Sequence, residues 1–132
     1  MFIPSTLLRR ALLADAAASG LSGALLSFDT APLSGLLGLP AAWLQTAGIV
    51  SLAYAVLVAW LGTREALWRP VVWAVVAGNV AWALGSIELL FSSRPTSLGL
   101  AYVIAQALLV ALFAELQFIG LRRSAQPALR HA

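Results

Sequence analysis

Polar side chains are rare in the apolar stretches of this chain, and four of them have chemistry suited to a site. Two are carboxylic acids, Asp15 and Glu115, and two are amides, Asn79 and Gln106. An acid within an apolar stretch can hold a proton or a cation, and an amide can hydrogen-bond a polar solute. These four residues are therefore the candidates for a proton or polar-solute site.

The two acids are expected at a similar depth. Asp15 lies about five residues inside Arg10, and Glu115 lies about seven residues inside Arg122. At 1.5 Å per residue both are ~8–10 Å from the helix ends, and antiparallel first and last helices would bring them to one level. One interpretation is a shared proton or cation site. The alternative, which we favour, is that each acid pairs with an arginine and anchors a helix end.

The two amides, Asn79 and Gln106, are expected near the middle of the membrane. They would either line a polar pocket or hydrogen-bond to each other or to a backbone carbonyl. Such bonds contribute about 0.6 kcal/mol in helical membrane proteins. We favour the structural interpretation for this pair as well.

Several classes of reactive site are excluded by composition. The chain has no cysteine and no lysine, and its one histidine, His131, lies near the C-terminus. Thiolate or histidine metal sites, histidine-ligated haem, a Schiff base and a histidine-activated serine all lack their required residues. We expect no cofactor, no metal ion and no catalytic residue.

Four long apolar stretches must position these side chains. Hydrophobic residues make up 61% of the chain and charged residues 10%, and a bilayer core ~30 Å thick needs about 20 apolar residues per helix. The sequence predicts an all-α membrane protein: an antiparallel four-helix transmembrane bundle over residues 1–123, a short cytoplasmic tail over 124–132, and the lipid bilayer as partner. The stretches are Ala11–Phe28, Ala41–Leu61, Val71–Phe91 and Leu98–Leu121.

A short helix is expected between the first two spans, at the membrane interface. Asp29 is a suitable capping residue, and Pro32 suits a first helical turn. Gly38 and Pro40 then provide a stop.

Small residues predict which helix faces pack. In the first stretch, Asp15, Ser19 and Ser22 recur at helical spacing, so this face should point into the bundle. The second stretch carries a stripe of small residues at steps of three and four, typical of close helix packing within the bundle or against a second copy. The stripe consists of Gly48, Ser51, Ala55, Ala59 and Gly62.

The eight arginines indicate orientation rather than nucleic-acid binding, because they cluster at helix ends and not on one face. Seven of them fall on the side of the two termini and the middle loop, and only Arg94 falls on the other side. Loops rich in arginine stay in the cytoplasm. Both termini are therefore predicted to be cytoplasmic.

The layout resembles small four-span bacterial membrane proteins and is loosely DoxX-like. The similarity is carried by Pro32–Pro40, Gly78–Trp82 and Ala105–Ala107. The resemblance implies a helical bundle in a bacterial inner membrane. It transfers no catalytic residue and no substrate.

Three hypotheses about function follow. The first is a non-enzymatic membrane component, either a homo-oligomer or an accessory subunit of a larger membrane complex, supported by the small-residue stripe and the lack of reactive groups. The second is a small proton- or solute-conducting transporter or channel that uses the four polar residues. The third is an enzyme acting on a lipid or sterol-like substrate in a membrane pocket.

Overall fold

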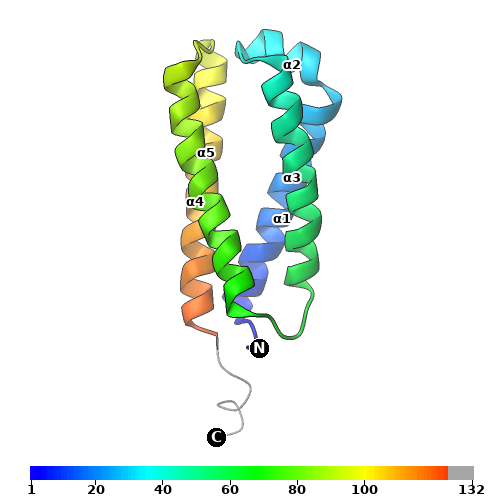
Figure 1. Cartoon of the computed structure of the whole chain (residues 1–132), viewed down its shortest axis with the longest axis vertical. Coiled ribbons are helices and arrows are strands. Elements are labelled where there is room, and N and C mark those ends of the chain that lie inside the picture. The colour runs from blue at the N-terminus through cyan, green and yellow to red at the C-terminus, as the bar shows by residue number, and fades with distance from the viewer. Residues whose placement is uncertain (125–132) are drawn as a thin grey trace, which may run out of the picture.

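Five helices form in residues 1–124, which are the residues that the computed structural model describes. They are α1 (Thr6–Phe28), α2 (Thr30–Leu37), α3 (Ala41–Gly62), α4 (Arg69–Ser92) and α5 (Ser97–Arg122). The four longer helices are each long and apolar enough to cross a membrane. The prediction of an all-α, antiparallel four-helix bundle with a short helix after the first span is confirmed (Figure 1), and the chain is a small multi-pass membrane protein.

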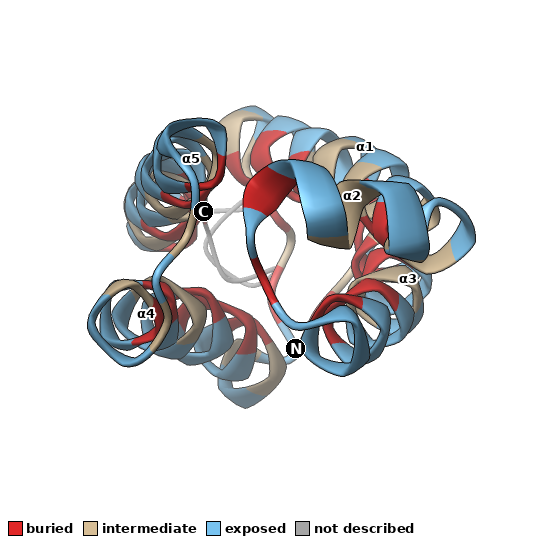
Figure 2. Cartoon of the chain, turned by 90° about the horizontal axis from the view of Figure 1, so that it is seen from above, coloured by how far each residue is buried: buried red, intermediate tan, exposed pale blue. Residues whose placement is uncertain are grey.

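The long helices associate as two close pairs. α1 packs along α3, α4 packs along α5, and α1 also contacts α5. α3 and α4 follow each other in sequence but do not pack closely over their described lengths. Figure 1 shows the two pairs near each other at the end with both termini and further apart toward α2. Buried residues face the inside of this arrangement and exposed residues face outward (Figure 2).

Glycine allows α1 and α3 to approach closely. A Cβ atom on Gly23 of α1 would lie 2.9 Å from the Gly48 oxygen, and a Cβ on Gly48 would lie 2.8 Å from the Ser27 nitrogen. At the other end of α3, a Cβ on Gly62 would lie 2.9 Å from Cγ of Leu13. The structure thus places both end glycines of the small-residue stripe against α1 of the same chain.

The end with both termini is sealed by the residues before α1. The backbone of Phe2 exchanges two hydrogen bonds of 2.8 Å with Leu67 in the α3–α4 loop, and the Arg69 guanidinium lies 4.9 Å from the Phe2 ring centre. Ser124 donates to the Gly120 carbonyl and accepts from the Ser5 backbone nitrogen, both at 2.8 Å. Ser124 is therefore buried in the bundle rather than part of a tail, and residues 125–132 lie outside the described residues.

The opposite end is covered by α2. Thr96, the N-cap of α5, donates from its backbone nitrogen to Leu37 at 3.1 Å and from its hydroxyl to Leu36 at 2.8 Å. Gly38 ends α2 with a φ of 68°, a left-handed conformation that favours glycine. Asp29 is the N-cap residue of α2, but its side chain does not form the expected capping hydrogen bond.

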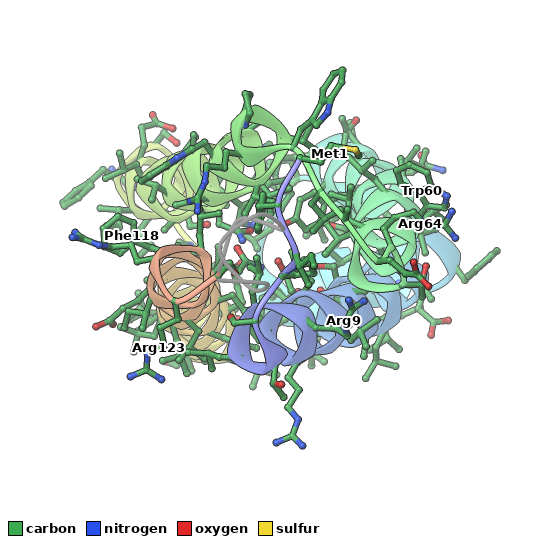
Figure 3. The ribbon with its side chains drawn as sticks, turned by 90° about the horizontal axis from the view of Figure 1, so that it is seen from below. Met1, Arg9, Trp60, Arg64, Phe118 and Arg123 are labelled. Atoms are coloured by element: carbon green, nitrogen blue, oxygen red, sulfur yellow. The ribbon has the colours of Figure 1, made fainter. Side chains whose placement is uncertain are left out.

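The arginines are divided between the two ends as their sequence positions indicate. Arg94 lies in the α4–α5 loop, on the α2 side, and the other described arginines lie at the end with both termini. Figure 3 shows Arg9, Arg64 and Arg123 around that end. Arg130 lies outside the described residues.

Candidate binding cavity

A cavity of about 250 Å³ lies between the four long helices, and every one of them contributes to its lining. Most of the lining is aliphatic or aromatic. The aromatic side chains are Trp43, Tyr54, Trp82, Tyr102 and Phe113. The polar ones are Asp15, Ser19, Ser22, Ser51, Asn79 and Gln106.

Asp15 is the one acidic residue of the lining, and its carboxylate is held by four hydrogen bonds. One oxygen, Oδ2, accepts from the Tyr54 hydroxyl at 2.6 Å, from Gln117 Nε2 at 2.7 Å and from Asn79 Nδ2 at 3.1 Å. The other oxygen, Oδ1, accepts only from the Ser19 hydroxyl, at 3.1 Å. Asp15 is 1% exposed. Four converging donors are the arrangement that stabilises a carboxylate anion.

The donors around Asp15 are themselves connected. Asn79 Nδ2 also donates to Gln117 Oε1 at 2.8 Å, and Gln117 is completely buried. The Tyr54 hydroxyl lies 3.1 Å from Asn79 Oδ1 as well. The network takes Asp15 and Ser19 from α1 and one residue from each of α3, α4 and α5, and so links both helix pairs at one level.

No arginine among the described residues pairs with Asp15, whose hydrogen bonds all come from neutral groups. The nearby Arg9 instead donates to the Gly62 carbonyl at 2.7 Å, at the end of α3. The favoured interpretation from sequence, in which an arginine neutralises this acid, is therefore wrong for Asp15. The reason is depth: the arginine head groups turn to the helix ends, while Asp15 turns into the bundle.

Gln106 lies on the cavity wall and forms a second network between α4 and α5. Its Oε1 accepts from Trp82 Nε1 at 3.0 Å, and its Nε2 donates to the Ser86 hydroxyl at 2.8 Å and to the Val103 carbonyl at 3.0 Å. Asn79 and Gln106 thus line one cavity but do not bond to each other. The Ser22 and Tyr102 hydroxyls, 3.0 Å apart, connect α1 with α5.

Glu115 does not belong to this cavity. It is exposed on α5, whereas Phe113 and Gln117, two residues to either side, are buried. Two residues turn a helix by about 200°, which places Glu115 on the opposite face. The expectation that Asp15 and Glu115 share a site is wrong, because equal depth on two helices does not imply that both side chains face inward.

Two members of the Asp15 network, Tyr54 and Gln117, were not candidates from sequence. A signal for Gln117 exists: it follows Gln106 by 11 residues, and three helical turns take about 10.8. Both glutamines therefore share the inward face of α5. Tyr54 has a similar signal, because it follows Ser51 of the small-residue stripe by three residues.

Comparisons of the chain with protein-family models, with curated proteins and with solved structures find no match. Within residues 1–124, no group of three or more His, Cys, Asp or Glu side chains is placed to hold a metal ion. The cavity and its two hydrogen-bond networks are thus the features from which a function can be argued.

Proposed function

We propose that this protein binds a small, largely apolar solute inside its helix bundle, as a membrane transporter or carrier rather than an enzyme. The observation that carries the proposal is the cavity lined by all four long helices, with the hydrogen-bonded Asp15 on its wall. Ligand sites typically combine an apolar lining with a few well-placed polar groups. A cavity of this kind favours a role in solute handling over a role as an accessory subunit.

The size of the cavity supports a solute of moderate size. A cavity of about 150 Å³ lined by apolar side chains can bind benzene. The cavity here, at about 250 Å³, has room for one aromatic ring with a short substituent. The lining also supplies aromatic faces against which such a ring would pack.

The seam between α3 and α4 is the proposed route of entry. Val50 of α3 and Gly78 of α4 line the cavity and are also exposed, Val50 to 48%. Because α3 and α4 are not closely packed, a solute dissolved in the bilayer would enter sideways between them.

The homo-oligomer hypothesis loses its main support, since α1 already covers Gly48 and Gly62 of the small-residue stripe. We further propose a bacterial inner-membrane location with both termini cytoplasmic, on the arginine distribution and the DoxX-like layout. The DoxX-like resemblance itself stays a prediction and assigns no residue a role.

A cavity-filling substitution tests the proposed binding. A Cβ on Gly78 would have no neighbour within 4 Å, and Gly78 lines the cavity. A phenyl ring in Gly78→Phe is therefore expected to occupy part of the cavity, and its Cβ would clash with no neighbouring atom. Gly85→Phe is the matched control, because Gly85 also has open space around it, lies on the same helix and does not line the cavity.

Two probes of equal size, 2-phenylethylammonium and propylbenzene, would be titrated into the purified protein in detergent by calorimetry, with protein-free micelles as the blank. We expect saturable binding of at least one probe to the wild type and to Gly85→Phe, and loss of that binding in Gly78→Phe. Absence of saturable binding for both probes, or equal binding to both variants, would overturn the proposal.

A further inference from the structure

We propose that the solute of this cavity is a small organic cation whose ammonium group binds Asp15 while its apolar body fills the space between the helices. This inference rests on the proposed binding function and names the chemical class of the ligand. It is carried by the charge balance around Asp15, by the unequal use of its two oxygens and by the composition of the cavity lining.

The charge of Asp15 has no partner in the described part of the chain. The carboxylate is almost completely buried at membrane depth, and only hydroxyl and amide groups bond to it. Charged side chains within a membrane normally pair with an opposite charge or mark an ion or substrate pathway. A bound cation would supply the missing charge.

The two oxygens of Asp15 are used unequally. Each oxygen offers about two lone-pair acceptor sites. Oδ2 already accepts three hydrogen bonds, whereas Oδ1 accepts one, from Ser19. Asp15 and Ser19 both line the cavity, so we place the ammonium group at Oδ1, the oxygen that still has acceptor capacity.

The rest of the lining selects an organic cation over other ligands. No arginine lines the cavity, so an anion would meet only the negative charge of Asp15. A calcium ion needs six to eight oxygen ligands, and the predominantly apolar walls do not supply them. Tyr54 and Trp82 instead offer aromatic faces, which attract ammonium groups and pack against hydrocarbon.

A proton on Asp15 would neutralise the same charge but would leave the apolar volume beside it unexplained. A cation with an apolar body accounts for both the charge and the space.

Comparison of the two probes on the wild-type protein tests the inference without any variant. 2-Phenylethylammonium and propylbenzene differ chiefly in the exchange of a terminal NH₃⁺ for a methyl group. A charge-assisted hydrogen bond to Asp15 should make the ammonium probe bind at least about tenfold more tightly at neutral pH. In Asp15→Asn this preference should disappear, and in Glu115→Gln, which changes an exposed acid of α5, it should remain.

The outcomes separate this inference from the function on which it rests. If propylbenzene binds the wild type as tightly as the ammonium probe, and Gly78→Phe abolishes both, the cavity binds solutes but the cation inference is wrong. The inference is also wrong if Asp15→Asn folds and keeps the preference. If neither probe binds, both proposals fail.

Discussion

Asp15 has an environment that few substitutions would preserve. Three donors point at Oδ2 from Tyr54, Asn79 and Gln117. Any replacement must therefore place an acceptor at the Oδ2 position, or these three donors lose the acceptor that they share. Oδ1 imposes a weaker demand, because a hydroxyl such as that of Ser19 can donate or accept.

Asparagine and leucine at position 15 should therefore behave differently. The amide oxygen of Asp15→Asn can take the Oδ2 position, and its NH₂ group can donate to Ser19, so the free energy of unfolding should change by no more than about 1 kcal/mol. Asp15→Leu leaves three donors without their acceptor and should lower that free energy by about 2–4 kcal/mol. Denaturant titration of both variants in detergent measures the difference. Equal losses for the two variants would show that the network does not stabilise the fold.

The sequence identified most of the polar residues that line the cavity. It did not predict which of these residues contact one another. Asp15, Asn79 and Gln106 were identified because they interrupt apolar stretches, and all three line the cavity. Glu115 was chosen by the same rule and faces outward. The rule counts polarity and depth and ignores the rotation of the helix, which decides the direction of each side chain.

Residue size explains how closely α1 and α3 approach each other. Between α1 and α3, Gly23 and Gly48 bring the backbones together, and no larger residue fits at either position. The cavity has Trp82 and Phe113 on the α4–α5 side. The remaining space therefore lies between the two pairs, next to these large side chains.

A single methyl group at Gly48 should disturb the α1–α3 pair. The Cβ of Gly48→Ala would lie 2.9 Å from Cβ of Leu26 and 2.8 Å from the Ser27 nitrogen. We expect the free energy of unfolding to fall by about 1–3 kcal/mol, the usual cost of overpacking. Gly85→Ala meets open space and should raise stability by about 0.5–1 kcal/mol through helix propensity. A Gly48→Ala variant as stable as Gly85→Ala would contradict the close packing.

Helix existence was easier to predict than helix ends. The four spans predicted from hydropathy lie entirely within the observed long helices, each of which extends beyond its span at one or both ends. α1 begins at Thr6 rather than near Ala11, because Ser5 caps it and its first two turns include Arg9 and Arg10. A count of apolar residues stops at those charges, although arginine is a good helix former whose long side chain can reach the membrane surface.

In the described part of the chain, one end of the molecule is closed by the residues before α1 together with Ser124, and the other end by α2. Phe2 and Ser124 close the first end through contacts with the α3–α4 loop and with α1. The contact between Ser5 and Ser124 joins segments 119 residues apart. No local sequence pattern predicts contacts of this kind. The separation of the two helix pairs toward α2 could not be predicted from local sequence either, because it depends on how all four long helices pack together.

Orientation in the membrane is the prediction that belongs to this scale. The described arginines other than Arg94 lie at the end with the termini, and this excess should hold that end in the cytoplasm. A reporter fused to the C-terminus and a second reporter inserted after Arg94 should give opposite locations, with the C-terminal one cytoplasmic. A C-terminal reporter outside the cytoplasm would refute the orientation.

The most direct test of a cation-binding cavity is to locate a bound cation. Crystals of the wild-type protein would be soaked with 2-(4-bromophenyl)ethylammonium, whose bromine is found by anomalous scattering. We predict one bromine peak among the aromatic side chains of the cavity, with the ammonium group within hydrogen-bond distance of Asp15 Oδ1. Bromine peaks confined to the lipid-facing surface, with the cavity empty or filled by lipid, would contradict the account.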